Sequence, residues 1–335
     1  MKLRSVVSAL VVCLGAAACE APLELGAVEA ERAKTVHRFD ELQAAAANHD
    51  ILTIVGMRGV VLTSADDGVS FTRAELEAPK DELPPSLIDV AACPDGALVA
   101  LDVARRIWRR EAGEANSWAA RPLPTEEDVL ALACDPAGRL WVVGSFALIL
   151  TSDDGGATWN DLSLGEDVML STVLFVDDTN GFITGEFGTV LRTGDGGATW
   201  EMAPVLPNEF FPQTAVFETV RDGWVAGLNG IILRTSDGGE SWVREPTPTR
   251  SPIYSLVSHG DTVFAAGNYG TLLRRRPEGW EPVSATPVTF GFLRALLPLS
   301  DDRLLVGGSG LLKVVSMPDD SDQTTSVALV RGEKS

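Results

Sequence analysis

Carboxylates recur at one spacing in this sequence, and they are the first groups that could do chemistry. Asp154 follows a serine by two residues and precedes Gly156, Thr158 and Trp159. The same pattern surrounds Asp66, Asp195 and Asp237, with Phe71, Trp200 and Trp242 in the aromatic place. Such carboxylates could act as general acids or bases. In a glycine-rich turn, however, aspartate accepts backbone N–H groups and glycine takes positive φ, so we predict that these four aspartates stabilise turns.

The other reactive side chains form no catalytic or metal-binding pattern. The histidines are scattered, at positions 37, 49 and 259, and lack metal-ligand spacing. The sequence contains no G-x-S-x-G, H-E-x-x-H or phosphate-loop motif. Arg192, Arg234 and Arg274 occupy the same position in three repeats. Together they could bind a carboxylate ligand. We favour a structural role, in which each aliphatic side chain packs between repeats and the guanidinium donates to backbone carbonyls. We predict no catalytic residues, no metal and no cofactor.

A repeated unit must position all of these groups. Gly185 to Trp200 reads G-E-F-G-T-V-L-R-T-G-D-G-G-A-T-W, and close copies begin at Gly144 and Gly227. Weaker copies begin at Gly56, Gly267 and Gly307, and Ala100 stands in the remaining interval. The steps are roughly 40 to 44 residues, the length of a four-stranded blade. The sequence therefore predicts an all-β fold, a seven-bladed β-propeller of four-stranded blades over residues 36–317, as a single domain.

Each unit is expected to contain four short strands. In the fourth unit they are predicted at 171–176, 181–185, 189–193 and 199–202, where β-branched runs are bounded by turn residues. These runs are apolar on both faces, as a blade packed between two other blades requires. The seventh unit loses its aspartate turn. Its outer strand, which would seal the ring, could come from 326–330 in the C-terminal tail (318–335) or from 35–39.

The repeat resembles those of known propellers. The pattern S-x-D-x-G-x-T-W is similar to the Asp-box, or bacterial neuraminidase repeat, of sialidases and related proteins. The whole unit resembles the photosystem II stability and assembly factor family, from about Val36 to Val315. That resemblance implies a lumenal or periplasmic propeller that assists membrane-protein assembly. Photosynthetic members are associated with a basic patch, whereas this chain is strongly acidic, so we expect a non-photosynthetic bacterial member.

Residues 1–18 have the features of a signal peptide. A basic start is followed by an apolar run, Val6 to Leu14, that is too short to span a membrane. Small residues then lead to Cys19, which resembles the lipidated cysteine of bacterial lipoproteins. The alternative is cleavage after Ala18 and a soluble periplasmic protein. We expect an exported protein at the periplasmic face of a bacterial membrane, with residues 19–35 as its tether.

Two cysteines lie beyond Cys19. Cys93 and Cys134 lie at like places in adjacent repeats, in A-A-C-P-D-G and L-A-C-D-P-A-G. An exported protein permits a disulfide between them. Two buried, unpaired thiols are the alternative, because the spacing between blades can exceed the reach of a bridge.

The candidate binding residues lie where the turns between second and third strands point to the mouth of the central channel. They are Arg58, Phe146, Glu186, Phe187, Asn229, Asn268 and Tyr269. These positions vary while the glycines beside them do not, so they are free to differ for function; the alternative is that they are solvated turn residues. Phe210 and Phe211, beside a proline in a link, suggest a protein-docking patch, unless they fold under the next blade.

The formal net charge of −20 disfavours nucleic acid and anionic lipid as partners. We expect a monomeric, non-catalytic scaffold that binds an envelope protein or membrane complex and touches the membrane only through its lipid anchor. The alternative is a glycan-binding or glycoside-hydrolysing, sialidase-like propeller, which needs paired carboxylates at the channel mouth. Asp102, Glu186 and the acidic run 126–128 are the candidates. Tyr254 and Tyr269 lack the acidic neighbour that a sialidase nucleophile needs.

Overall fold

The computed structural model describes residues 25–78, 80, 82–114, 117–283, 290–300 and 303–316. The chain divides into two compact units, 1–34 and 35–335. In the first unit, α1 (Gly26–Arg32) buries none of its side chains, so the segment predicted as a tether includes a short helix. Cys19 and the predicted signal segment lie outside the described residues. Of the helices described, none is both long enough and apolar enough to cross a membrane.

The second unit consists of antiparallel sheets in chain order. The first is β1 (Leu42–Ala47), β2 (Leu52–Gly56), β3 (Val60–Ser64) and β4 (Thr72–Glu75). The second is β5 (Leu87–Ala92), β6 (Leu98–Asp102), β7 (Arg106–Arg110) and β8 (Ala119–Pro122). The third is β9 (Val129–Cys134), β10 (Leu140–Gly144), β11 (Ile149–Ser152) and β12 (Asn160–Asp161). The fourth is β13 (Leu170–Phe175), β14 (Gly181–Gly185), β15 (Val190–Thr193) and β16 (Glu201–Met202).

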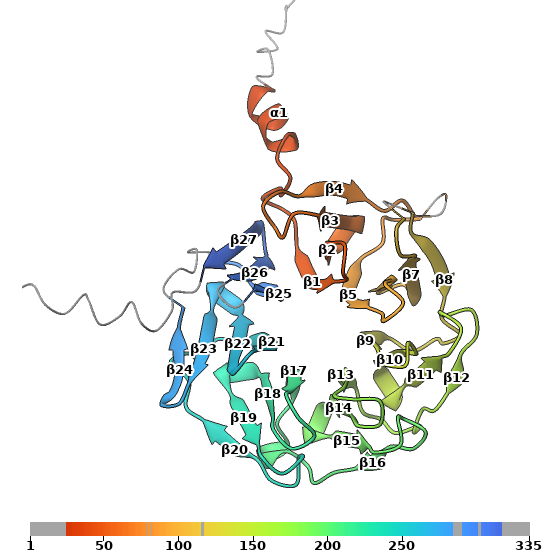
Figure 1. Ribbon diagram of the computed structural model, residues 1–335, viewed down its shortest axis with the longest axis vertical. Helices are drawn as coiled ribbons and strands as arrows, with labels where there is room; N and C mark the ends of the chain where they lie inside the picture. The colour runs from red at the N-terminus through yellow and green to blue at the C-terminus, as the bar shows by residue number, and fades with distance from the viewer. Residues whose placement is uncertain are drawn as a thin grey trace, which may run out of the picture. The chain divides into compact units, whose positions relative to one another are not determined.

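The remaining three sheets complete the ring. The fifth is β17 (Pro212–Phe217), β18 (Gly223–Gly227), β19 (Ile232–Thr235) and β20 (Val243–Glu245). The sixth is β21 (Ile253–His259), β22 (Thr262–Gly267), β23 (Leu272–Arg276) and β24 (Gly279–Pro282). The seventh, within the described residues, has three strands: β25 (Leu293–Ser300), β26 (Arg303–Gly308) and β27 (Leu311–Ser316). In Figure 1 the first strand of every sheet is innermost, which confirms the predicted seven-bladed propeller.

Apolar packing between neighbouring blades forms the core. Each of seven hydrophobic clusters joins one blade to the next, including the last to the first. The second strands carry the pattern of burial that this arrangement demands, since β2, β6, β10, β14 and β18 are buried at every position. Both faces of a blade exclude water, so the strands read as continuous apolar runs instead of alternating ones.

The Asp-box turns connect third and fourth strands and also join blades. Asp195 accepts hydrogen bonds from the Thr199 N–H (2.9 Å), the Thr199 hydroxyl (2.6 Å) and the Thr193 hydroxyl (2.7 Å). These bonds lower the pKa of Asp195 to about 2. Asp66, Asp154 and Asp237 have the same bonds and the same lowered pKa. The structure thus confirms them as turn aspartates.

A glycine in each Asp-box turn lies against the preceding blade. Gly197 has φ +82°, and a side chain there would overlap the ring of Trp141 in the third blade. Gly68, in the first blade, faces Val314 in the seventh in the same way. The aromatic residues Trp159, Trp200 and Trp242 pack at the edges of the interblade clusters. The Asp-box therefore fixes both its own turn and the spacing between blades.

The ring closes by side-chain packing between its first and last blades. Leu42, Ile54 and Leu62 share a cluster with Ala295 and Leu305. Residues 35–39 form no strand, which removes one of the two predicted closing strands; a bridge between Glu41 and Ser309 lies near them instead. The other prediction, at 326–330, falls outside the described residues, as does the tail 318–335.

A disulfide joins Cys93 to Cys134, with their Cα atoms 5.3 Å apart. Cys93 directly follows β5 and Cys134 ends β9, so the bond links the innermost strands of the second and third blades. The pairing left open by the sequence is formed, because equivalent positions on adjacent inner strands lie within the range a disulfide can bridge.

Candidate functional site

One face of the ring carries the turns between second and third strands, together with the links between blades; we call it the turn face. The opposite face carries the Asp-box turns and the disulfide; we call it the Asp-box face. Five of the turns are short 3-10 turns: η1 (Met57–Gly59), η2 (Ser145–Ala147), η3 (Glu186–Gly188), η5 (Leu228–Gly230) and η6 (Asn268–Gly270). Antiparallel blades in a ring must place all of them at the same end.

The middle residue of each turn has a left-handed backbone. Its φ lies between +53° and +60° at Arg58, Phe146, Phe187, Asn229 and Tyr269. Backbone hydrogen bonds to the links hold this shape; for example, the Glu186 N–H donates to Met169 O (2.8 Å) and the Ala147 N–H to Val168 O (2.7 Å). A left-handed conformation is costly for any residue other than glycine, and asparagine or aspartate tolerates it better than an aromatic.

Aromatic residues nevertheless occupy three of the five positions and face solvent. Phe146 is 52% exposed, Phe187 55% and Tyr269 66%. Two more exposed aromatics lie in the links of the same face, Phe39 (63%) and Phe290 (88%). Among the described residues these five are the large, mainly exposed aromatic side chains, and none lies on the Asp-box face. The turn face is therefore the apolar face of the ring.

The other predicted turn residues share this face but have structural partners. The Arg58 guanidinium donates to Phe39 O (2.7 Å), and the Glu186 carboxylate accepts the Met169 N–H (3.1 Å). Asn229 is exposed at its turn, whereas Asn268 is half-buried and its carbonyl accepts the Thr271 hydroxyl (2.7 Å). The structure brings these residues together on one face, as the sequence predicted.

The predicted docking pair in the link before β17 is only partly available. Phe210 is 8% exposed and packs with Leu206 and Val225 between the fourth and fifth blades. It follows the short 3-10 turn η4 (Pro207–Glu209). Phe211 is half-buried. The prediction of Phe210 as a docking residue is wrong, because its ring fills an interblade gap that would otherwise be empty.

One of the carboxylates proposed for a glycosidase is withdrawn from the surface. Asp102 is fully buried and accepts hydrogen bonds from Trp108 Nε1 (2.8 Å) and Arg106 Nε (2.9 Å). Glu126 is exposed in its link, where it pairs loosely with Arg105 (3.7 Å). Burial therefore removes Asp102 from the candidates for the paired carboxylates that glycoside hydrolysis needs.

The repeated arginines pair with carboxylates at the outer part of the blades. Arg192 contacts Glu240 of the next blade (2.5 Å), Arg234 contacts Asp222 (3.2 Å), and Arg274 contacts Glu281 (2.6 Å). They therefore form no clamp around the channel, although their partners are acidic side chains and not the expected carbonyls. The three histidines belong to no cluster of metal-binding side chains within the described residues.

The central channel contains a polar cavity of about 240 Å³ that the sequence did not reveal. Every innermost strand has a β-bulge at its second residue, and the bulged side chain lines this cavity. The seven bulged residues are Gln43, Ile88, Leu130, Ser171, Gln213, Tyr254 and Arg294. A bulge turns a side chain away from its regular direction, which here is toward the channel axis.

Polar side chains of the channel also join adjacent inner strands. The Asp89 carboxylate accepts the Leu132 N–H (2.8 Å), and the Thr214 hydroxyl accepts the Leu256 N–H (3.1 Å). The Ser171 hydroxyl donates to Pro212 O (2.8 Å). Inner strands expose an unpaired edge to the channel, and these bonds satisfy part of it.

Comparison with known proteins matches the repeats to one family. The family described as photosynthesis system II assembly factor YCF48 matches residues 110–205 and 159–255. The solved structure of YCF48 bound to D1 peptide is 15% identical, with a TM-score of 0.69 over 85% of this chain and 94% of that chain. YCF48 from Cyanidioschyzon merolae is 15% identical, with a TM-score of 0.66 over 84% and 97% of the two chains.

A lyase has the same fold. Virginiamycin B lyase from Staphylococcus aureus is 13% identical, with a TM-score of 0.69 over 82% of this chain and 94% of that chain. At these identities the solved structures share the fold with this chain, and their activities do not transfer with it. No curated protein matches the sequence.

Proposed function

Because residues 110–255 match the photosystem II assembly factor family and the ring has the fold of its solved members, we propose that this chain is a member of that family and a non-catalytic, protein-binding scaffold that docks its partner on the turn face. The partner is an envelope protein or membrane complex outside the cytoplasm. The residues that make the contact are the exposed turn residues, with Phe146, Phe187 and Tyr269 as anchors and Arg58 and Asn229 beside them.

The observation that carries this proposal is the one-sided distribution of exposed aromatic side chains. Phe146, Phe187 and Tyr269 stand at equivalent places in three blades, in a backbone conformation that other residues adopt at lower cost. Folding alone would favour asparagine there, as at Asn229. Aromatic residues are enriched in the energetically dominant parts of protein interfaces, because they bury a large area with little loss of side-chain freedom. Selection for binding explains why such costly residues are kept.

The relatives and the charge agree with a protein partner. A structure of YCF48 carries the description "bound to D1 peptide", so one propeller with this fold binds a polypeptide. A net charge of −20 favours a partner with a neutral or basic surface and disfavours nucleic acid. The likeness to virginiamycin B lyase supports no enzymatic proposal here, because it concerns the fold alone.

Export and lipidation are part of the same proposal. The sequence of residues 1–19 favours a lipoprotein signal, and residues 20–35 would then tether the ring to a membrane with Cys19 as the lipidated residue. A Cys19→Ala variant should lose the lipid and leave the membrane fraction. If this variant stays in the membrane fraction as the wild type does, anchoring through Cys19 is wrong.

The docking face is tested by photo-crosslinking in the native host. A benzoylphenylalanine residue replaces Phe187 or Tyr269 on the turn face, or Val69 on the Asp-box face, where the side chain is more exposed than either. We expect one discrete adduct from positions 187 and 269 and none from position 69. A Phe146→Ser/Tyr269→Ser background should abolish the adduct at position 187. Equal adducts from both faces, or none from the turn face, would refute the proposal.

A further inference from the structure

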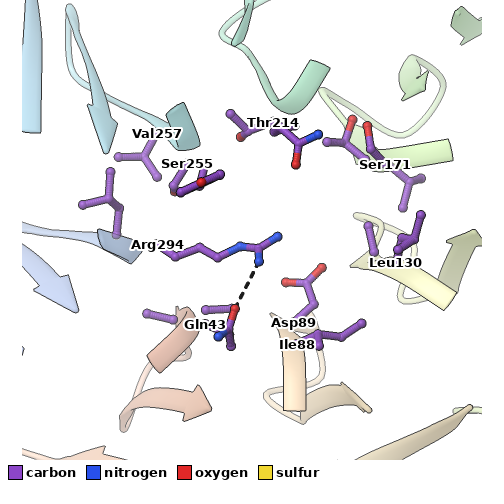
Figure 2. A pocket seen from close by; sticks show the side chains of 17 residues that line it. Gln43, Ile88, Asp89, Leu130, Ser171, Thr214, Ser255, Val257 and Arg294 are labelled. Carbon is purple, nitrogen blue, oxygen red and sulfur yellow. Dashed lines mark hydrogen bonds between the residues drawn. The ribbon is translucent and has the colours of Figure 1, made fainter. Parts of the chain in front are cut away.

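The channel wall is built asymmetrically from equivalent positions. The bulged residues of the second and third blades are apolar, Ile88 and Leu130, whereas those of the other five blades are polar. Figure 2 shows Ile88 and Leu130 on one side of the channel and Arg294 extending into it from the opposite side. A wall that served only to close the ring would have no reason to separate polar from apolar residues in this way. The arrangement therefore suggests a bound molecule with one charged and one apolar end.

Arg294 is a cation with unused hydrogen-bonding capacity. Within the described part of the chain, its guanidinium donates one hydrogen bond, from Nη1 to Gln43 Oε1 (3.1 Å), and forms no ion pair. The Tyr254 ring lies 5.9 Å from it. Water reaches the side chain, yet protein encircles it, and this loss of solvent lowers the pKa of Arg294. Four of its five N–H donors have no hydrogen bond to a described residue, and a carboxylate in the cavity could accept two of them side by side.

Asp89 supplies the complementary charge across the channel. Its two carboxylate oxygens accept the Val90 and Leu132 N–H groups, each at 2.8 Å, which fixes the side chain in place. Figure 2 shows this carboxylate facing the guanidinium of Arg294 with no bond between them. Encirclement by protein raises the pKa of Asp89 to about 6, so the group is mostly ionised at pH 7. An ammonium group placed in the gap would meet an acceptor already held in position.

The cavity is small, and the acidic surface of the protein disfavours anionic ligands. The cavity volume of about 240 Å³ lies below the roughly 300–1,000 Å³ typical of sites for drug-sized ligands, so it suits a small molecule. The acidic surface of the protein repels simple anions, but a zwitterion carries no net charge and is not repelled. A free amino acid with an apolar side chain suits Arg294, Asp89 and the apolar wall at once, because it joins a carboxylate, an ammonium group and a side chain within a few bonds.

We propose that the central channel binds a free α-amino acid with an apolar side chain. Arg294 holds the carboxylate, Asp89 accepts the ammonium group, and Ile88 and Leu130 contact the side chain. This site is separate from the turn face and does not depend on what docks there.

Isothermal titration of the full chain tests the proposal with L-leucine as the probe. Two analogues separate the charges: N-acetyl-L-leucine keeps only the carboxylate, and L-leucinamide keeps only the ammonium group. We expect L-leucine to bind and each analogue to bind at least tenfold more weakly. Aspartate, whose side chain is charged, should also bind at least tenfold more weakly than leucine.

Variants assign the two charges. Arg294→Gln should weaken leucine at least tenfold, whereas Asp89→Asn should weaken leucine but leave N-acetyl-L-leucine unchanged. Val69→Ser, an exposed residue of the Asp-box face far from the channel lining, is the control and should change binding less than twofold; unchanged circular dichroism shows that each variant is folded. Absence of leucine binding at millimolar concentration overturns the proposal, as does equal binding of leucinamide. Binding of N-acetyl-L-leucine as tight as that of leucine would show a carboxylate site that serves chain ends instead.

Discussion

The two faces of the ring differ in what recurs from blade to blade. On the Asp-box face the side chains recur: Asp195 and its equivalents have the same partners at nearly the same distances in four blades. On the turn face the backbone recurs, with φ between +53° and +60° in five blades, while the side chain changes from Arg58 to Phe146 to Asn229. Repeated side chains indicate a structural requirement. A repeated backbone with changing side chains indicates a frame on which function is free to vary.

The largest expected effect concerns the disulfide of the Asp-box face. A Cys93→Ser/Cys134→Ser variant should lose about 4 kcal/mol of the free energy of unfolding, the value expected when a loop closed over 41 residues is released. Urea denaturation measures it, and reduced wild type should match the variant. Crosslinking from position 187 should be unchanged. If the adduct were lost while the protein stayed folded, the two faces would not be independent.

A second prediction concerns the Asp-box glycine. Gly197→Ala should cost about 3 kcal/mol, because the new methyl group overlaps the buried Trp141 ring and the residue keeps positive φ. Gly194→Ala, in the same turn, meets only ordinary contacts and is the control. Chemical denaturation of both proteins gives the difference. A cost below 1 kcal/mol for Gly197→Ala would mean that the blades adjust their spacing easily.

Low pH should remove the stabilisation that the Asp-box carboxylates contribute to the fold. Asp66, Asp154, Asp195 and Asp237 have a pKa of about 2, against about 3.9 in the unfolded chain. Their contribution is complete above about pH 4 and is lost as the pH falls toward 2. Asp89 acts with the opposite sign: its raised pKa of about 6 makes stability fall as the pH rises from about 4 to 6.

Substitutions can separate the effect of the Asp-box aspartates below pH 4 from that of Asp89 between pH 4 and 6. Denaturation between pH 2 and 7 should show a shallower loss below pH 4 in Asp195→Asn and the disappearance of the decline between pH 4 and 6 in Asp89→Asn. Identical profiles for Asp195→Asn and wild type would contradict a stabilising role for the turn carboxylates.

The smallest effect is a gain on the turn face. Phe187→Asn should raise the free energy of unfolding by up to about 1 kcal/mol, because asparagine tolerates the left-handed backbone and little packing is lost from a side chain already half exposed. The reciprocal change, Asn229→Phe, should lower it by a similar amount. Thermal denaturation compares them. Destabilisation by Phe187→Asn would show that the ring of Phe187 supports the fold, and would argue against its role as a docking residue.

The sequence predicted the parts of the fold that are written in repeated residues. Seven units, their strand order and the four Asp-box aspartates followed from glycine spacing and β-branched runs, because each blade must bury both faces against its neighbours. Phe210 could not be placed from the sequence, since an aromatic residue in a link can point outward or fill a gap. Ring closure was also open, because packing between Leu42 and Leu305 involves residues more than 250 positions apart, which a local pattern cannot reveal.

The channel was missed for a different reason. A β-bulge at Gln43 or Arg294 changes the direction of one side chain without changing the composition of its strand, so the pattern L-x-A or L-x-D gives no sign of it. The second blade was predicted correctly, but the role of its Asp102 was not. Its turn has lost the glycines, and the buried Asp102 bonded to Arg106 and Trp108 fixes the strand ends in their place. A signal was present, since D-x-x-x-R-x-W occurs again at Asp135, with the same bonds to Arg139 and Trp141.

The seven bulges give the channel an unusual capacity for evolutionary change. Each blade contributes one side chain to a common lining, and none of the seven residues has a register partner on the adjacent strand of its own blade. A duplicated gene could therefore acquire a new preference through single codon changes, with the ring left intact. The lining residues, in chain order around the channel, are Q-I-L-S-Q-Y-R, and we expect descendants of this protein to differ first at those seven positions.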